Sequence, residues 1–174
     1  ILSALVERER SGLGQYVDFI FSSVSNNGSD GGSSDTNAYD GSPVVLDMYS
    51  FLSVFAYNYF DGIDADTYNS YSSITSYLGL IFTGVYGNGD NGVEIDNTAV
   101  DEGLTVQTVY SFLSYVGDNY SNGVAMTNFA TGDSASYQGA YFIYTAVDNN
   151  GLDGLNAANI AYYDGNVTQV MDAH

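Results

Sequence analysis

Three short segments of the chain combine oxygen-bearing side chains with glycine, and their residue types are suited to binding a metal ion. They cover residues 26–31 (NNGSDG), 88–92 (NGDNG) and 149–154 (NNGLDG). Calcium takes about six to eight oxygen ligands from carboxylates, amides and carbonyls, and glycine lets the backbone curl closely around the ion. The segments therefore predict calcium as a cofactor, with these candidate ligands: Asn27, Asp30, Asn88, Asp90, Asn150 and Asp153.

A structural interpretation of the same segments is equally available. None of them has the ligand order of an EF-hand loop, and neither do Asp61, Asp64 and Asp66. Asparagine, aspartate and glycine are also the residues that tight turns and helix C-caps favour. The sequence leaves both interpretations open.

Few residues are available for catalysis. The chain has no lysine or cysteine and a single histidine, His174, so Schiff bases, histidine-based triads and thiolate metal sites lack their parts. The carboxylate pairs that a glycosidase would need are Glu94 with Asp96 and Asp101 with Glu102. Because Asp101 recurs at the repeat position of Asp40, we interpret it as structural. We expect no enzymatic activity and assign no catalytic residue.

Charge and composition restrict the classes of partner. Two basic residues face 21 acidic ones, giving a formal net charge of -19, and such a chain repels phosphate groups. We therefore expect no nucleic-acid partner. No apolar run approaches the roughly 18 residues of a membrane span. A cysteine-free chain rich in Asp, Gly, Tyr and Ser is typical of secreted or surface proteins, so we expect an extracellular or cell-surface location.

An internal repeat is the strongest signal in the sequence. The segment YSFLS occurs at positions 49–53 and again, unchanged, at positions 110–114. The offset indicates a repeat of about 61 residues, a length typical of stacked supersecondary units. On this period we describe residues 1–174 as one repeat domain. It has a partial unit at 1–43, full units at 44–104 and 105–165, and the start of a further unit at 166–174.

The spacing of apolar residues predicts helices inside each unit. In residues 74–85 they fall at i, i+3, i+4, i+7, i+8 and i+11, and residues 13–24 repeat this spacing. We therefore predict an all-α fold of two-helix repeats, with Leu52 and Leu113 buried at equivalent positions. Abundant Tyr, Phe, Val, Thr and Gly favour strands instead, so an all-β repeat domain is the alternative.

These features predict a non-enzymatic structural protein that acts in self-assembly or adhesion. One unit is split between the two ends of the chain. If the ends meet within one molecule, three units close a helical ring. If they meet between molecules, the partner is a second copy and the product is a homo-oligomer or a head-to-tail filament. The second candidate function is an extracellular carbohydrate-binding module that uses Tyr with Asp or Asn side chains to bind surface glycans. Its candidate exposed tyrosines are Tyr39, Tyr68, Tyr71, Tyr162 and Tyr163.

Overall fold

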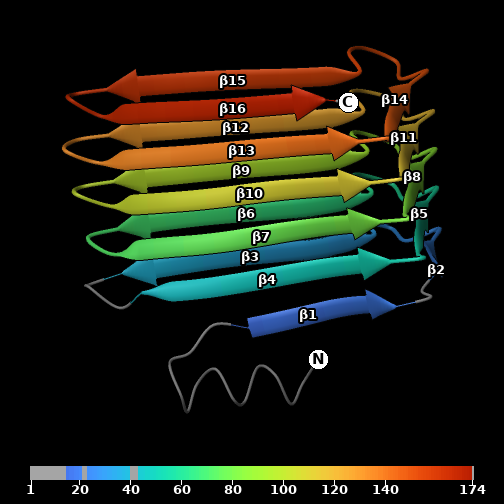
Figure 1. Cartoon of the computed structure of the whole chain (residues 1–174), viewed down its shortest axis with the longest axis horizontal. Helices are drawn as coiled ribbons and strands as arrows, with labels where there is room; N and C mark the ends of the chain where they lie inside the picture. Colours follow the sequence, from blue (N-terminus) through green and yellow to red (C-terminus); the bar gives the residue numbers. More distant parts are fainter. Residues whose placement is uncertain (1–14, 21–22, 40–42, 174) are drawn as a thin grey trace.

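The protein is an all-β solenoid, so the predicted all-α fold is wrong and the all-β alternative is correct (Figure 1). The computed structural model describes residues 15–20, 23–39 and 43–173, and no helix occurs among them. It follows that this part of the chain has no helix long and apolar enough to cross a membrane. Equivalent positions of successive coils are 30 or 31 residues apart, as the contacts of Asn58 with Asn88 and of Asn88 with Asn119 show.

Each coil contributes one strand to each of three parallel sheets. The first long strands form a six-stranded sheet in this order: β1 (Gln15–Ile20), β4 (Val44–Phe51), β7 (Ser73–Ile81), β10 (Leu104–Phe112), β13 (Ala135–Ile143) and β16 (Asn166–Ala173). The second long strands form the opposite sheet: β3 (Gly32–Tyr39), β6 (Ile63–Ser70), β9 (Val93–Val100), β12 (Val124–Thr131) and β15 (Leu155–Tyr162). Short strands close one side: β2 (Ser23–Ser25), β5 (Val54–Ala56), β8 (Gly84–Tyr86), β11 (Tyr115–Gly117) and β14 (Ala146–Asp148).

In long strands such as β6, β9 and β12, every second side chain points into the solenoid, as the two-residue period of a strand requires. In β9, for example, Val93 and Ile95 are fully buried, whereas Glu94 between them is only partly buried. The interior also holds polar ladders. Gln138 Nε2 donates to Gln107 Oε1 at 3.2 Å, and Gln169 Nε2 donates to Gln138 Oε1 at 2.8 Å.

The short strands lie between two sharp corners, and the repeated YSFLS segment forms the first of them. Residues in the left-handed region mark this corner in successive coils, including Leu52 (φ 50°), Phe82 (φ 51°) and Leu113 (φ 49°). A side chain at such a corner points away from the core. Leu52 and Leu113 are accordingly 43% and 44% exposed, which corrects the prediction that both are buried.

The helix prediction failed because apolar residues occur on both faces of the strands. Of the apolar stripe in residues 74–85, Ile74, Leu78 and Val85 are buried in the core, while Phe82 lies exposed at a corner. Phe82 contacts aromatic residues of neighbouring coils that are register partners of Ile81, with ring centroids 6.1 Å from Phe51 and 6.0 Å from Phe112. Apolar residues thus occur both on the inner face of the strand and at the exposed corner. Because the corner also interrupts the two-residue alternation, the combined spacing resembles that of a helix.

The repeat detected in the sequence corresponds to two coils, because at some positions the same residue returns in every second coil. Tyr49 and Tyr110 are both register partners of Gly79, which lies between them. A Cβ atom on Gly79 would lie 2.7 Å from the Tyr49 ring, so the intervening coil needs glycine here. Each predicted unit, 44–104 and 105–165, spans two coils. Residues 1–14 of the predicted partial unit lie outside the described residues.

Candidate functional site

A ladder of five stacked asparagines opens the loops that follow the short strands. In each step, the Oδ1 atom of one asparagine accepts from the backbone N–H and the Nδ2 atom of the asparagine one coil earlier. Asn88 Oδ1, for instance, lies 3.1 Å from the N atom and 2.9 Å from the Nδ2 atom of Asn58. The members are Asn27, Asn58, Asn88, Asn119 and Asn150.

A second ladder closes the same loops and runs in the opposite direction. Here a side-chain oxygen accepts from the backbone N–H one coil later, as in the 2.8 Å contact from Asn91 N to Asp61 Oδ1. The two ladders hold each loop at both ends. The members of the second are Asp30, Asp61, Asn91, Asn122 and Asp153.

The six predicted calcium ligands are distributed over three places. Asn27, Asn88 and Asn150 belong to the first ladder, and Asp30 and Asp153 are the ends of the second. Asp90 lies between the ladders and lines a surface hollow. Hydrogen bonds thus occupy oxygen atoms of several of these residues, and calcium binding at these six residues stays a prediction.

A group of carboxylates that the sequence analysis did not assign lies on the outer face of β3, β6 and β9. Carboxylate oxygens of Asp35, Asp64 and Asp66 all lie within 4.8 Å of one another. The register places Glu94 beside Asp64 and Asp96 beside Asp66 on the next coil. We call these five residues the acidic face.

Burial and mutual repulsion make the charged state of the acidic face costly. Burial is the main cause that raises the pKa of Asp64 to about 8, and repulsion from neighbouring carboxylates is the second. Burial and repulsion from Asp61 likewise raise the pKa of Glu94 to about 7. The Asp96 Oδ1 atom is buried and has no hydrogen-bond partner among the described residues. The only basic side chains of the protein, Arg8 and Arg10, lie outside the described residues. Within the described part, this face is suited to hold protons or hard cations.

The acidic face has a recognisable pattern in the sequence. Two acidic residues lie two positions apart in one strand, and a second such pair follows one coil later. Asp64 and Asp66 alternate with buried residues, and Glu94 and Asp96 repeat the pattern one coil later. The helical interpretation concealed it, because the two members of each pair share a face only in a strand. The other carboxylate pair, at 101–102, occupies an exposed turn with positive φ at both residues.

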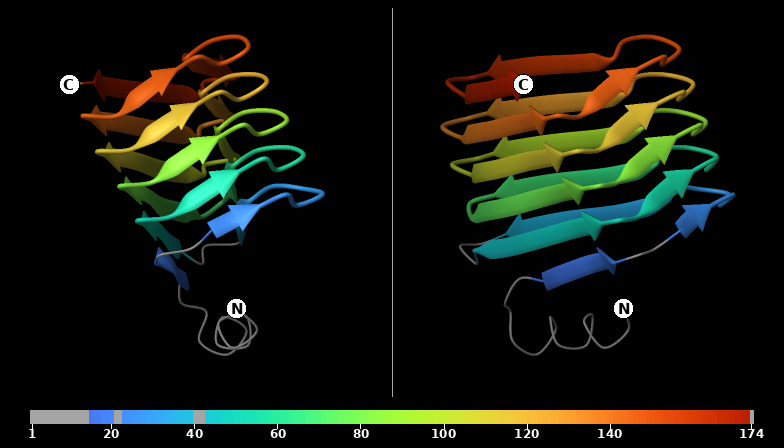
Figure 2. Two further views of the ribbon diagram at one scale, coloured as in Figure 1. Left: turned by 90° about the vertical axis from the view of Figure 1, so that its right-hand side faces the viewer. Right: turned by 45° about the vertical axis from the view of Figure 1, so that its right-hand side comes forward.

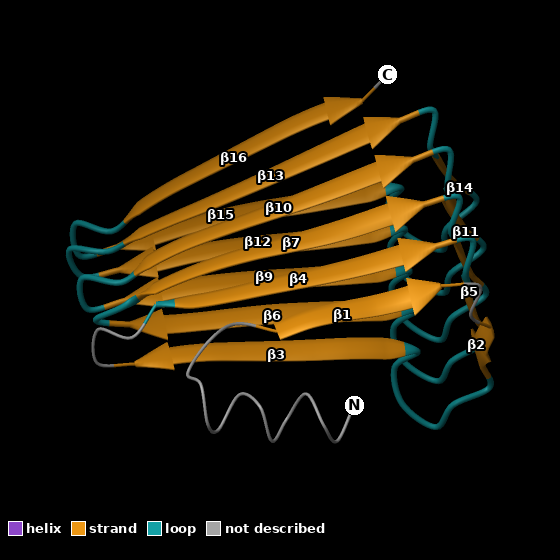
Figure 3. Ribbon diagram, turned by 60° about the horizontal axis from the view of Figure 1, so that its bottom comes forward, coloured by secondary structure: helices purple, strands orange, loops and turns teal. Residues whose placement is uncertain are grey.

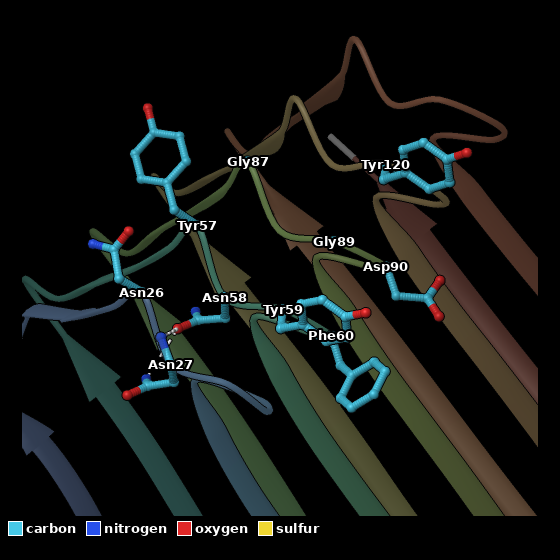
Figure 4. A pocket seen from close by; sticks show the side chains of 10 residues that line it. All are labelled: Asn26, Asn27, Tyr57, Asn58, Tyr59, Phe60, Gly87, Gly89, Asp90 and Tyr120. Atoms are coloured by element: carbon cyan, nitrogen blue, oxygen red, sulfur yellow. Dashed lines mark hydrogen bonds between the residues drawn. The ribbon is translucent and has the colours of Figure 1, made fainter.

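The loops between the ladders carry exposed aromatic side chains around a shallow groove (Figure 4). A hollow of about 660 Å³ is lined by Tyr57, Tyr59, Phe60 and Tyr120, with Gly89 and Asp90 between them. An adjoining hollow of about 710 Å³ shares Gly89, Asp90 and Tyr120. We call the two hollows together the loop groove. Figure 2 shows these loops projecting beyond the short strands, one above another.

The five tyrosines that the sequence analysis proposed as exposed are exposed, but they do not line either hollow. They belong to the long strands and to the turns between them: Tyr39, Tyr68, Tyr71, Tyr162 and Tyr163. The tyrosines of the groove have their own signal. Tyr59 and Tyr120 each follow a ladder asparagine and occupy equivalent positions of the sequence repeat.

The C-terminal coil exposes the cross-section of the core. Leu155 and Met171 are 38% and 46% exposed, although their register partners one coil earlier, Val124 and Ala140, are buried. Among the described strands, β14, β15 and β16 each pair on one side only, and they lie together at one end of the stack (Figure 3). The Asn150 Nδ2 atom at the end of the ladder is buried without a described partner. We call this surface the C-terminal end face.

Comparisons of the chain with protein-family models, with characterised proteins and with solved structures find no match.

Proposed function

We propose that the protein is a non-enzymatic structural solenoid that associates end to end with further copies of itself. The observation that carries this proposal is the C-terminal end face. Its apolar residues occupy positions that earlier coils bury, and no described strand lies beyond β14, β15 or β16 in their sheets. Unpaired edges of this kind are templates for pairing with another chain. A copy whose β1 lies beside β16 would pair the free edge of the six-stranded sheet and cover Met171.

The polarity of the ladders favours head-to-tail association. Asn150 at the C-terminal end has a buried Nδ2 donor without a described partner, whereas Asn27 at the other end donates its own Nδ2 to Asn58 Oδ1. Asp153 is the last residue of the second ladder, and its carboxylate can accept a hydrogen bond from a following coil. Asp61 Oδ1 accepts in this way from the backbone N–H of Asn91, one coil later. Two C-terminal faces in contact would place donor against donor and carboxylate against carboxylate. A heterologous contact keeps the ladders of both copies running in one direction, and such contacts build filaments when the rotation does not close. With β1 of the next copy beside β16, Asn27 of that copy lies two coils beyond Asn150, so the ladders share a direction without joining.

The strand register supports the same orientation. Gln15 of β1 occupies the strand position that Gln107 and Gln138 fill in later coils and Gln169 fills in β16. A copy stacked with its β1 next to β16 therefore places glutamine opposite glutamine in the register. In the coils between Gln15 and Gln107 this position holds Leu46 and Ser76. Among the later glutamines, Gln169 Nε2 donates to Gln138 Oε1.

Charge opposes this association, and cations are expected to relieve the opposition. Two chains that each carry a net charge of -19 repel one another unless ions screen or bind them. The acidic face supplies carboxylate oxygens of the kind that calcium prefers. We therefore include calcium as a stabiliser and an extracellular or cell-surface location, where calcium is available, in the proposal.

Negative-stain electron microscopy of the whole chain tests this function. With increasing protein concentration and added calcium chloride, we expect unbranched filaments whose width is that of one solenoid. Particles with the size of a single chain under all these conditions would contradict the proposal. Closed dimers would also contradict it, because a closed dimer pairs the end faces without the ladder polarity.

A further inference from the structure

The loop groove has a regular spacing that the end-to-end association does not explain. At the position after the ladder asparagine, glycine and tyrosine alternate from coil to coil along the whole described solenoid. The series is Gly28, Tyr59, Gly89, Tyr120 and Gly151. We propose that this groove is a binding site for an extended, neutral β-1,4-linked polysaccharide, held by Tyr59 and Tyr120 as two consecutive stacking platforms.

The first step of the argument is steric. The glycine between the two tyrosines is held against the loop one coil earlier, so a Cβ atom on Gly89 would lie 2.1 Å from the backbone O atom of Tyr59. No side chain fits there. The alternation of glycine and tyrosine therefore leaves the surface at Gly89 free of a side chain. The tyrosine rings on either side of it are exposed, Tyr59 to 68% and Tyr120 to 80%.

The second step is spacing. Neighbouring strands of a sheet lie about 4.8 Å apart, so platforms two coils apart are separated by about 10 Å. In an extended β-1,4-linked glycan, alternate sugar rings present the same face, and the repeat of that face is one disaccharide. Its length matches the separation of the platforms. Tyr120 lines both hollows of the groove, so it is the platform that a bound chain would share between two disaccharides.

The third step is rigidity. Backbone hydrogen bonds join the loops to one another, from Tyr120 N to Asn88 O at 3.0 Å and from Gly89 N to Asn58 O at 2.9 Å. Asp90 N and Ser121 N continue this pairing within the loops. The rings are thus carried on a backbone that is already ordered. A preorganised site of this kind loses less conformational entropy when it binds.

The fourth step is the polarity of the groove. The Asp90 side chain lies between Tyr59 and Tyr120 and presents a carboxylate, which can only accept hydrogen bonds when ionised (Figure 4). Sugar hydroxyls donate to such a group while their ring faces pack on tyrosine. A proline-rich peptide has a comparable repeat, but proline has no backbone N–H to donate. The net charge of -19 opposes acidic glycans, which leaves a neutral polysaccharide as the best match.

Isothermal titration calorimetry of the whole chain with cellohexaose and chitohexaose tests the site. It is carried out at a protein concentration below that of any self-association, so its outcome is independent of the end-to-end contact. We expect at least one of these glycans to bind, more tightly than its disaccharide does. Tyr120→Ala should weaken binding about tenfold or more, and Tyr59→Ala should weaken it less, because Tyr120 lines both hollows.

Tyr163→Ala is the matched control, since Tyr163 is 86% exposed but does not line the groove. It should bind like the parent, and circular dichroism should show that all three variants retain the strand content of the parent. Three results would overturn the proposal: no binding of either hexasaccharide, equal weakening by Tyr163→Ala, or binding of a proline-rich peptide in the absence of glycan binding.

Discussion

Removing one side chain from the middle of the asparagine ladder should destabilise the protein far more than removing the side chain at its N-terminal end. In the variant Asn88→Ala, two buried donors, the backbone N–H and the Nδ2 group of Asn58, lose their acceptor. A buried polar group without a partner costs about 1–3 kcal/mol, so the two donors give a loss of about 2–6 kcal/mol. The lost bond from Asn88 Nδ2 to Asn119 Oδ1 adds to it.

The matched variant is Asn27→Ala. Asn27 is exposed, and its side chain makes one described ladder contact, from Nδ2 to Asn58 Oδ1 at 3.0 Å. Truncation leaves Asn58 Oδ1 with the backbone N–H of residue 27 at 3.4 Å and with access to water. We therefore expect a loss below about 1 kcal/mol, as is usual for an exposed contact.

Equilibrium unfolding in urea, followed by circular dichroism, measures both losses. The parent and the two variants should have the same m-value, because the surface exposed on unfolding is nearly the same. The difference then lies in the midpoint. If Asn88→Ala and Asn27→Ala lower the free energy of unfolding by similar small amounts, the ladder does not stabilise the solenoid as its geometry indicates.

Three further predictions concern the acidic face and the core. Because folding raises the pKa of Asp64 from 3.8 to about 8, the folded state binds more protons than the unfolded chain between these values. The free energy of unfolding should therefore fall as the pH rises through this window, and pH-dependent urea titrations should show a shallower fall for Asp64→Asn. Calcium should raise the thermal midpoint more than sodium at equal ionic strength, since a specific site adds RT ln(1 + [L]/Kd), about 2.7 kcal/mol at 100 times Kd; identical melting curves would exclude such a site. Leu78→Ala should cost about 2–5 kcal/mol because Leu78 is buried, whereas Leu52→Ala should cost less than about 1 kcal/mol because Leu52 projects from a corner; equal losses in urea unfolding would contradict the register.

The sequence alone identifies the repeat but assigns it the wrong secondary structure. The offset between the two YSFLS segments is real and spans two coils. At one strand position Gly79 lies between Tyr49 and Tyr110, although Tyr141 in the following coil departs from this alternation. The period of one coil is harder to detect, since different residues carry the same geometry in successive coils. At one ladder position, for example, the chain has aspartate in Asp61 and asparagine in Asn91.

Alternation of apolar and polar residues, the usual sign of a strand, is hidden in this chain for a physical reason. Inward positions include polar residues such as Gln107 and Asn97, which are buried because ladder partners satisfy them. Outward positions include aromatic residues such as Phe82, which stack on their neighbours. A pattern based on hydrophobicity alone cannot separate the two faces when both carry ladders.

The calcium site predicted from the sequence stays a prediction. The loops that begin at Asn27, Asn88 and Asn150 carry amides that form a ladder, and this ladder depends on the stacking of coils. The acidic face depends on the register between β6 and β9, which places Asp66 beside Asp96. Such contacts between coils become visible only once the coil length is known.

Sedimentation velocity across a concentration series, in calcium-containing buffer, tests the end-to-end association most directly. The variant Met171→Asp places a charge on the C-terminal end face, and Val170→Asp places the same charge at the preceding position, where the register partner Gly139 belongs to the outer face of β13. We predict that the parent and Val170→Asp grow into an open-ended series of species as concentration rises, while Met171→Asp remains a monomer. A parent that stays monomeric at all concentrations, or a Met171→Asp variant that associates like the parent, would contradict the proposed function.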